Sequence, residues 1–310
     1  MTLFQVIKQY QYGVAALVII VLFFHLLPDQ GLVYPSIKDA AHTLVFGVTT
    51  YLLLRVFLTN YSSWAQLIGI CFFTFLLGVV IELIQPYVGR DRSLIDVYND
   101  FAGCSAAGLF YARRLVANVI LRRIFIWLSA GLVLSGVIFP ALNTYTLLQR
   151  NMSEPILINF DRNWELALTN VSKASNLTIM DSPADWQNMS QVAKVDFGSG
   201  EKYPGISFPY IYETWSKYSF LKFEVFSEQK NDQLLVLRIH DDLHQNQYHD
   251  RFNKKLTVKP GLNQFVIALS DVKSAPKLRE LQLDSISSMA FFMVSPEPSV
   301  SLYFDNLVLQ

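Results

Sequence analysis

The chain has 310 residues, of which 52% are hydrophobic and 16% are charged, and its formal net charge is zero. The charged fraction lies well below the roughly 25% of soluble domains, and the neutral balance gives no sign of a nucleic-acid partner. The length suggests about two domains. Residues 1–150, dominated by apolar runs, are expected to form a transmembrane domain, and residues 151–310, of ordinary soluble composition, an extracytoplasmic domain.

The apolar half predicts a bundle of about five membrane-spanning helices that contacts the lipid bilayer, because a spanning helix needs about 20 mostly apolar residues. The fourth is the least apolar, since polar residues occupy its first turns. Gly103 with Ala107, and Cys104 with Gly108, follow the small-xxx-small spacing that lets a neighbouring helix approach closely. The five predicted helices cover residues 10–27, 40–58, 64–84, 95–111 and 124–148.

The orientation of the bundle follows from the arginines of the loop after the fourth helix, which are Arg113, Arg114, Arg122 and Arg123. Basic loops face the cytoplasm. This places the N-terminus inside and everything after residue 148 outside. Two arginines are exceptions to this rule, because the loop between the third and fourth helices lies outside in this topology and contains Arg90 and Arg92.

The polar half predicts an all-β sandwich. Strand-length segments such as SFLKFEVFS, QLLVLRIHD, NQFVIALS, SMAFFMVS and SLYFDNLVL are rich in β-branched and aromatic residues and are bounded by turn formers. They recur with little helical periodicity between them, which is typical of a sandwich or jelly roll.

Ionisable groups gather where the helices end. Asp39 and His42 open the second helix, and Glu82 and Gln85 close the third, each pair on one helix face. The fourth helix begins with Arg90, Ser93, Asp96 and Asp100. All three places lie at the outer membrane face in this topology. Because isolated charges near lipid are costly, we expect these side chains to converge on one another.

A purely structural role for these groups is the alternative. Ser93 and Asp96 form a capping-box pattern, Asp39 would favour the positive end of its helix, and Glu82 would pair with Arg90. None of these roles needs a ligand.

Residues from about 20 to 115 resemble the VanZ-like membrane domain. The resemblance rests on the ordered residues Asp39, His42, Glu82, Gln85, Arg90, Ser93, Asp96 and Gly103. One departure is Asp100, where the family usually has Asn. The family is bacterial and is named for a protein linked to resistance to the glycopeptide teicoplanin. It implies a role in the cell envelope and a bacterial inner-membrane location, but no established reaction.

Residues 155–310 are similar to bacterial carbohydrate-binding-like jelly rolls, which often end in a strand with an Asp where Asp305 stands. No cofactor is expected apart from a structural Ca²⁺, for which Asp161 and Asp305 are the candidate ligands. The mixture of His240, His244, His249, Asp241, Asp242 and Asp250 suggests either a metal site or a solvated loop. Aromatic candidates for stacking on sugars, or alternatively for the core, are Trp186, Tyr210, Tyr212, Trp215 and Tyr218.

Three functions remain open. The first is an envelope protein that binds or senses a glycan or glycolipid through the polar cluster and the sandwich. The second is a membrane enzyme in which His42 is acid or base, Glu82 or Asp96 is the second carboxyl group, and Arg90 anchors a phosphate. The third is a non-catalytic scaffold. The chain has no P-loop, dinucleotide fingerprint, nucleophile elbow or HExxH motif.

Overall fold

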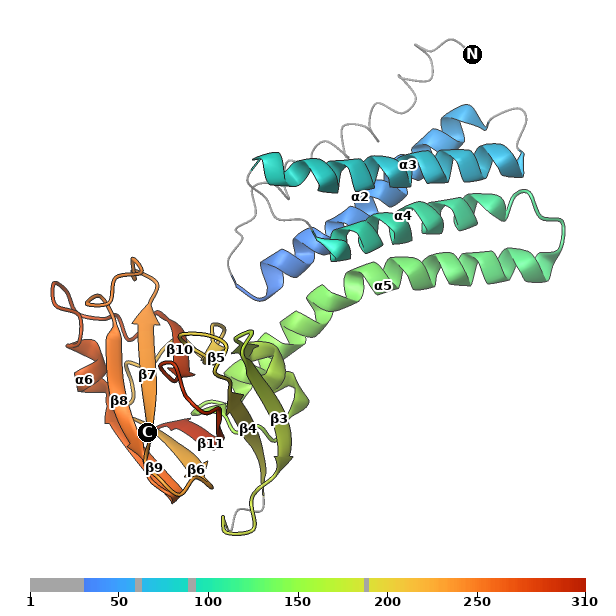
Figure 1. Cartoon of the computed structure of the whole chain (residues 1–310). Coiled ribbons are helices and arrows are strands. Elements are labelled where there is room, and N and C mark those ends of the chain that lie inside the picture. The colour runs from blue at the N-terminus through green and yellow to red at the C-terminus, as the bar shows by residue number, and fades with distance from the viewer. Residues whose placement is uncertain (1–30, 59–62, 89–92, 187–189) are drawn as a thin grey trace. The chain divides into compact units, whose positions relative to one another are not determined.

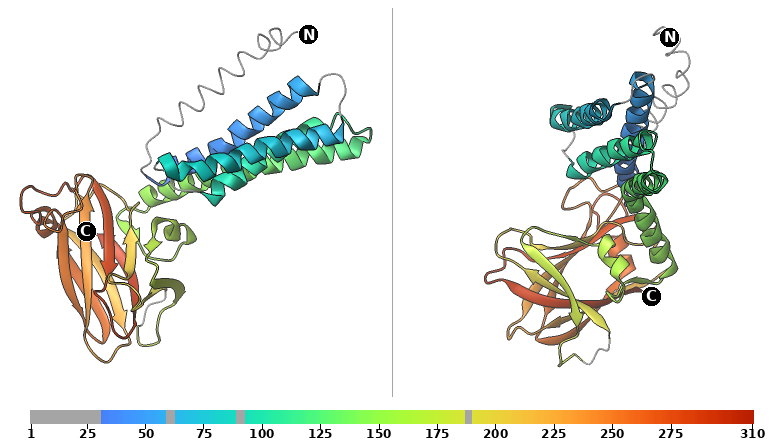
Figure 2. Two further views of the ribbon diagram at one scale, coloured as in Figure 1. Left: turned by 45° about the horizontal axis from the view of Figure 1, so that its top comes forward. Right: turned by 90° about the vertical axis from the view of Figure 1, so that its right-hand side faces the viewer.

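A computed structural model describes residues 31–58, 63–88, 93–186 and 190–310 of the chain (Figure 1). The chain divides into two compact units, the first ending at Thr144 and the second running from Tyr145 to Gln310. The first unit is helical and the second is a β-sandwich, as Figure 2 also shows. The helix predicted at residues 10–27 lies outside the described residues.

The helical unit contains α2 (Val33–Phe57), α3 (Trp64–Ile84), α4 (Leu94–Ala112) and α5 (Val119–Met152), with the short 3₁₀ helix η1 (Gln85–Val88) after α3. Within the described residues three stretches are long and apolar enough to cross a membrane, namely Val33–Phe57, Trp64–Tyr87 and Val119–Met152. The fourth predicted span forms a helix, α4, but it is not among these three. Asp96, Asn99 and Asp100 lower its hydropathy.

Helix α4 lies at the centre of the bundle, where 11 of its 19 residues are buried. Its small residues bring neighbouring helices close. A Cβ atom at Gly103 would overlap the carbonyl oxygen of Thr43 on α2 and would lie 2.8 Å from the Gly47 amide nitrogen. Ser129 on α5 donates a hydrogen bond of 2.8 Å to the Ala106 carbonyl oxygen. The small-residue spacing therefore marks a helix packing site, as predicted.

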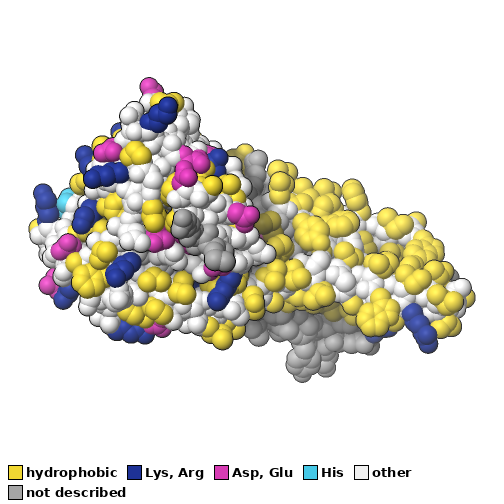
Figure 3. Space-filling model, turned by 90° about the horizontal axis from the view of Figure 1, so that it is seen from below, with side chains coloured by type: hydrophobic (Ala, Val, Ile, Leu, Met, Phe, Trp, Pro, Cys, Tyr) yellow, Lys and Arg dark blue, Asp and Glu magenta, His cyan; other side chains and the backbone are white. Residues whose placement is uncertain are grey.

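The outer faces of the other helices are hydrophobic. Phe72 on α3 and Trp127 on α5 are 63% and 75% exposed. Figure 3 shows yellow hydrophobic side chains over the helices, while Lys, Arg, Asp and Glu gather on the β-sandwich. Large exposed apolar surfaces mark contact with lipid or protein, and their length here fits a bilayer.

The second unit is an antiparallel sandwich of two sheets. One sheet has the order β3-β4-β11-β6-β9, with β1 paired to β11, and the other has the order β2-β5-β10-β7-β8. The strands are β1 (Ile156–Ile158), β2 (Asn170–Val171), β3 (Ser175–Asp181), β4 (Gln191–Phe197), β5 (Gly205–Phe208), β6 (Phe220–Ser227), β7 (Gln233–Asp241), β8 (Phe252–Val258), β9 (Gly261–Ala268), β10 (Ile286–Phe292) and β11 (Val300–Leu309). Two short helices, η2 (Asn163–Leu168) and α6 (Leu269–Lys273), complete the unit.

The five segments predicted as strands correspond to β6, β7, β9, β10 and β11. Their inward side chains form an aromatic core between the sheets. The Phe291 ring centroid lies 5.0 Å from that of Phe223 and 5.2 Å from that of Phe304. The aromatic residues that helped to predict these strands thus supply the core between the sheets.

The last turns of α5 belong to the sandwich unit. Arg150 Nη1 donates hydrogen bonds of 3.0 and 3.1 Å to the carbonyl oxygens of Tyr210 and Ile211. The carboxylate of Glu213 lies 3.6 Å from the same nitrogen. Only 11% of the Arg150 side chain is exposed, so this arginine fixes the helix end to the loop before β6.

Candidate functional site

The ends of α2, α3 and α4 place polar side chains together inside the helical unit. One ligand-type atom from each of His42, Glu82 and Asp96 lies within 4.8 Å of the other two. We refer to these three residues as the His–Glu–Asp cluster. The expected convergence of these three side chains is found. Arg90, which was expected to join them, lies outside the described residues.

Asp100 orients His42. The Nδ1 atom of His42 lies 2.9 Å from Asp100 Oδ1, and its Nε2 atom lies 3.8 Å from Asp96 Oδ2. The first distance is a hydrogen bond and the second is too long for one. Because an ionised carboxylate only accepts, Nδ1 carries the proton toward Asp100. Asp100 therefore supplies the hydrogen-bond partner of the imidazole.

Glu82, on α3, is held by Gln85 of η1 and by Ser93, the residue just before α4. Gln85 Nε2 donates a hydrogen bond of 2.8 Å to Glu82 Oε1, and the Ser93 backbone N–H donates one of 3.1 Å to Glu82 Oε2. The Ser93 hydroxyl accepts a hydrogen bond from the Asp96 N–H at 3.1 Å. Half of the capping box is therefore present. Its other half is replaced, since Glu82 takes the Ser93 N–H and leaves the Asp96 carboxyl group to face His42.

Asp39 borders the cluster. Its backbone carbonyl oxygen accepts a hydrogen bond of 2.8 Å from Asn99 Nδ2. Its carboxyl group is near enough to that of Asp96 for the two to interact. Asp39 is half-buried, whereas the side chains of Asp96 and Asp100 are 8% and 1% exposed. Several acidic groups are thus close together where little water reaches them, so that their negative charge needs compensation.

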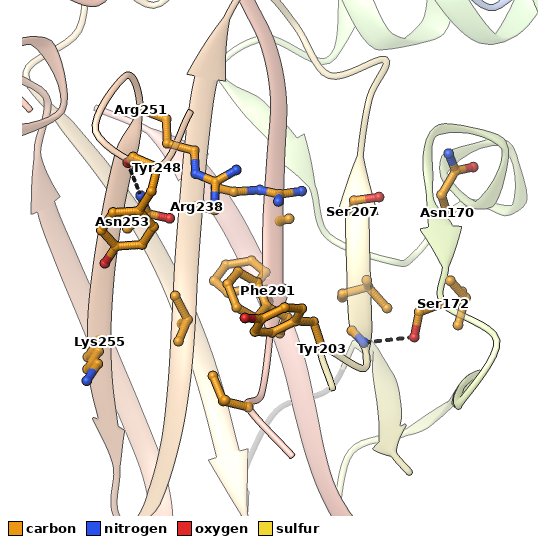
Figure 4. Close-up of a pocket in the computed structure, with 17 residues that line it drawn as sticks. Asn170, Ser172, Tyr203, Ser207, Arg238, Tyr248, Arg251, Asn253, Lys255 and Phe291 are labelled. Atoms are coloured by element: carbon orange, nitrogen blue, oxygen red, sulfur yellow. Dashed lines mark hydrogen bonds between the residues drawn. The ribbon is translucent and has the colours of Figure 1, made fainter. Parts of the chain in front are cut away.

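A second candidate site is a groove of about 510 Å³ on the outer face of the β2-β5-β10-β7-β8 sheet (Figure 4). The strand register places its floor residues in two rows that run across the strands. The first row is Asn170, Ser207, Ala290, Arg238 and Asn253. The second row is Gly205, Phe292, Val236 and Lys255.

Two exposed tyrosines are among the residues that line the groove. Tyr248, in the loop between β7 and β8, is 71% exposed, and Tyr203, before β5, is 54% exposed. The Asn253 side chain fixes the first of these loops by a hydrogen bond of 3.2 Å to the Tyr248 carbonyl oxygen. Tyr203 meets the Phe292 ring edge-on, with centroids 5.7 Å apart. The Tyr203 ring is thus held against Phe292, and both tyrosines are more than half exposed.

The charged residues that line the groove are all basic, namely Arg238, Arg251 and Lys255. Burial, and then the neighbouring Arg251, lowers the pKa of Arg238 from its ordinary value. The Arg251 Nε atom is buried and has no hydrogen-bond partner among the described residues. Figure 4 shows the two guanidinium groups side by side. Two cations held together without an acid among the lining residues favour an anion.

The aromatic candidates from the sequence do not line this groove. Trp186 and Trp215 are core residues, 4% and 0% exposed, and Trp186 stacks on Phe226. Tyr210, Tyr212 and Tyr218 are half-buried. The groove aromatics Tyr203 and Tyr248 were missed because both stand in loops. Which sheet face a loop residue lies over depends on how the strands pair, and the sequence alone does not show that pairing.

The histidine and aspartate mixture after β7 is an ion-pair network. Arg279 donates hydrogen bonds to Asp241 Oδ1 at 2.7 Å and to Asp250 Oδ1 at 2.6 Å. These bonds lower the pKa of Asp250 to about 2. Although burial opposes it, Arg279 also holds the pKa of Asp241 below its ordinary value. His244 Nδ1 lies 3.0 Å from the Asp250 carbonyl oxygen. The carboxylates are therefore already paired.

His240, His249 and Asp242 do not complete a metal-binding group in the structure. Burial, and then His244, lowers the pKa of His240 to about 4. His249 and Asp242 are exposed. In the described part of the sandwich no three His, Cys, Asp or Glu side chains meet as closely as the His–Glu–Asp cluster does.

Asp161 and Asp305, the residues suggested for Ca²⁺, accept hydrogen bonds from residues that are near in space but distant in sequence. The Gln191 N–H donates to Asp161 Oδ1 at 3.1 Å, and the Ser190 hydroxyl donates to Asp305 Oδ2 at 2.8 Å. Asp161 is exposed and Asp305 is fully buried. The calcium site stays a prediction.

No family model and no curated protein sequence matches the chain. Solved structures share the fold of the sandwich at low identity. A family 11 carbohydrate-binding module from Clostridium thermocellum, in complex with a β-1,3-1,4-mixed-linked tetrasaccharide, is 16% identical with a TM-score of 0.35, and the match covers 46% of this chain and 86% of that one. A family 28 module specific for non-crystalline cellulose is 13% identical with a TM-score of 0.35, covering 51% and 96%. An exo-β-agarase is 12% identical with a TM-score of 0.40, and the match covers 51% of this chain but only 25% of the agarase.

Proposed function

We propose that the protein is a membrane-anchored receptor of the bacterial cell envelope that binds an acidic glycan in the groove of its β-sandwich. The observation that carries the proposal is the lining of that groove. Two tyrosines that are more than half exposed and three basic side chains line the same groove, with no acidic residue among its lining residues.

This lining suits a charged sugar polymer. Rigid aromatic faces supply contact area at little conformational cost, and sugar rings present an apolar face that stacks on them. Arginine forks bind carboxylate or phosphate oxygens in two-point geometry. A volume of about 510 Å³ is within the range of small-ligand sites. The groove is therefore suited to a short stretch of a polyanionic glycan.

The first test compares two neighbouring lysines of β8. Lys255 lines the groove, whereas Lys254 points to the opposite face of the strand. We expect Lys255→Gln to weaken binding of an acidic oligouronate by several-fold and to reduce its salt dependence, because one ionic contact is lost. Lys254→Gln removes the same charge and is expected to leave binding unchanged. Isothermal titration on the detergent-purified full chain measures both.

Tyr248→Ala supplies a second, uncharged probe in the same titration. Loss of a stacked tyrosine is expected to weaken binding roughly tenfold while leaving the salt dependence in place. Equal affinity of wild type, Tyr248→Ala and Lys255→Gln would remove the groove from consideration.

The receptor reading places the sandwich outside the cytoplasm. Arg113 and Arg114 follow α4, and Arg122 and Arg123 lie in the first turns of α5. Such basic clusters face the cytoplasm. At the other end of the bundle, Asn143 on α5 donates a hydrogen bond of 3.0 Å to the Leu32 carbonyl oxygen just before α2. The chain thus leaves the bundle at the end opposite to the arginines.

We therefore expect an alkaline-phosphatase fusion after Gln310 to be active and one after Arg114 to be inactive. Green fluorescent protein fused at the same two positions should give the reverse pattern. An inactive phosphatase at Gln310, with the fusion intact on an immunoblot, would place the groove in the cytoplasm and contradict an envelope glycan as its ligand.

The polar residues of the helical unit add a second part to the proposal. The VanZ-like resemblance includes all three members of the His–Glu–Asp cluster, and we propose that this region contacts the headgroup of an envelope glycolipid or a lipid-linked intermediate. Asp39, Gln85, Arg90, Ser93 and Asp100 are proposed to take part in it as neighbours of the cluster in space or sequence.

A membrane enzyme is the second candidate function. The Asp100–His42 pair, at 2.9 Å, is the arrangement by which a carboxylate orients a general base. An enzyme would change the amounts of lipid-linked intermediates in a deletion strain, whereas a receptor would leave them unchanged. An envelope lipid and glycan profile of such a strain separates the two.

A further inference from the structure

The His–Glu–Asp cluster has the geometry of a metal site as well as of an ion-pair network. Its three side chains come from three different helices and offer one imidazole nitrogen and two carboxylate oxygens within 4.8 Å of one another. The separation of 3.8 Å between His42 Nε2 and Asp96 Oδ2 is too long for a hydrogen bond. Two ligands of one ion at about 2.1 Å each would have this separation at an angle of about 130°.

The partners of His42 and Glu82 hold them in the form that a metal requires. With its Nδ1 proton directed to Asp100, the neutral imidazole keeps a lone pair on Nε2, and a carboxylate behind a histidine is the usual outer partner of a metal ligand. Glu82 accepts one hydrogen bond at each oxygen. Each of these oxygens retains a lone pair that is free to coordinate.

The burial of Asp96 is a second, independent observation that points to a bound cation. Its side chain is 8% exposed, and its Oδ1 atom is buried without a hydrogen-bond partner among the described residues, while the carboxyl group as a whole lies within hydrogen-bond reach of the Asp39 carboxyl group. A buried carboxylate oxygen in this state is costly. It lies beside two further acidic side chains, Asp39 and Asp100. A cation would satisfy the orphan oxygen and offset the concentrated negative charge.

We propose that His42, Glu82 and Asp96 bind one divalent transition-metal ion of the Zn²⁺ or Mn²⁺ class. Imidazole and carboxylate ligands suit these ions, whereas Ca²⁺ prefers oxygen ligands alone and thiophilic ions prefer sulfur. Three protein ligands leave coordination positions open, where water or a phosphate oxygen binds. The site is independent of the glycan groove, and its test reads metal content and coordination rather than glycan binding.

The test uses the full chain, purified in detergent, stripped with a chelator and titrated with Zn²⁺ and with Mn²⁺ by calorimetry, with the bound metal counted by mass spectrometry. We expect one equivalent of ion per chain. His42→Gln and Asp96→Asn should each weaken binding by at least about 100-fold, and Asp100→Asn, which removes only the outer partner, by roughly tenfold. His249→Gln and Glu297→Gln are matched controls at exposed positions and should retain the wild-type affinity.

X-ray absorption of the Zn²⁺-loaded wild type tests the proposed ligand set even if the variants fail to fold. The expected spectrum contains nitrogen and oxygen ligands at about 2.0–2.1 Å, one imidazole and no sulfur. Absence of metal above the buffer background in folded wild type would overturn the proposal. So would binding that survives His42→Gln but is lost in His244→Gln, which would place the ion in the sandwich.

Discussion

Replacing Arg279 with Ala is expected to lower the melting temperature of the β-sandwich by about 10 °C. The Asp241 side chain is fully buried and accepts hydrogen bonds from Arg279 and from the Gln282 N–H. Removal of the arginine leaves a buried carboxylate without its charge partner, which costs roughly 3 kcal/mol. A sandwich of this size loses about 2–4 °C per kcal/mol. Thermal unfolding of the full chain, followed by near-ultraviolet circular dichroism, measures the shift.

The Lys273–Glu280 ion pair provides the matched control, because both of its side chains are at least half exposed. Lys273→Ala should change the melting temperature by only a degree or two, since surface pairs contribute about 0–1 kcal/mol. In the wild type the contribution of Asp250 should be present above its ordinary pKa of 3.8 and be lost as the pH falls toward its pKa of about 2. Arg279→Ala should flatten this acid dependence. Equal shifts for both substitutions would contradict a structural role for the network.

Replacing Gly103 with Leu is expected to abolish the folded helical unit. The α2 backbone occupies the space that any side chain at this position would need, as shown by the overlap of a Cβ atom with the Thr43 carbonyl oxygen. Even Gly103→Ala should cost roughly 3 kcal/mol, because α2 and α4 would have to move apart. Fluorescence-detected gel filtration in detergent should show aggregation for Leu and a reduced melting temperature for Ala.

Gly131 on α5 is the control, since no atom lies within 4 Å of a Cβ atom built there. Gly131→Ala should leave the gel-filtration profile unchanged. Because Thr43 follows His42 in the chain, a shifted α2 should also disturb the His–Glu–Asp cluster. A well-folded Gly103→Leu protein would show that α2 and α4 are not packed as closely as described.

Much of the fold was predictable because it depends on local patterns. Runs of apolar residues located the helices, and segments rich in β-branched and aromatic residues between turn formers located the longer strands. The sequence predicted a helix at α4, but it did not show that this helix lies at the centre of the bundle. A central helix is covered by other helices instead of lipid, so it tolerates Asp96 and Asp100 and gains from small residues.

The polar cluster was predictable because charges near lipid must meet one another. The role of Asp100 was not, since only the packing of α4 on α2 shows that its carboxylate faces His42. The groove was also missed. Its floor depends on which residues lie opposite each other in five strands, and its borders on the loops that hold Tyr203 and Tyr248. Arg279 was missed for the same reason, because it is 38 residues from Asp241 in the sequence.

The most direct measurement compares an acidic glycan with its neutral methyl ester. Oligogalacturonate and its fully methyl-esterified form share a backbone, and calorimetric titration of the full chain with each isolates the part played by Arg238, Arg251 and Lys255. We expect the acidic form to bind, rising salt to weaken its binding, and the esterified form to bind at least about tenfold more weakly. Equal affinity for the two forms, or binding of the acidic form that persists unchanged when these three basic residues are replaced by Gln, would contradict this expectation.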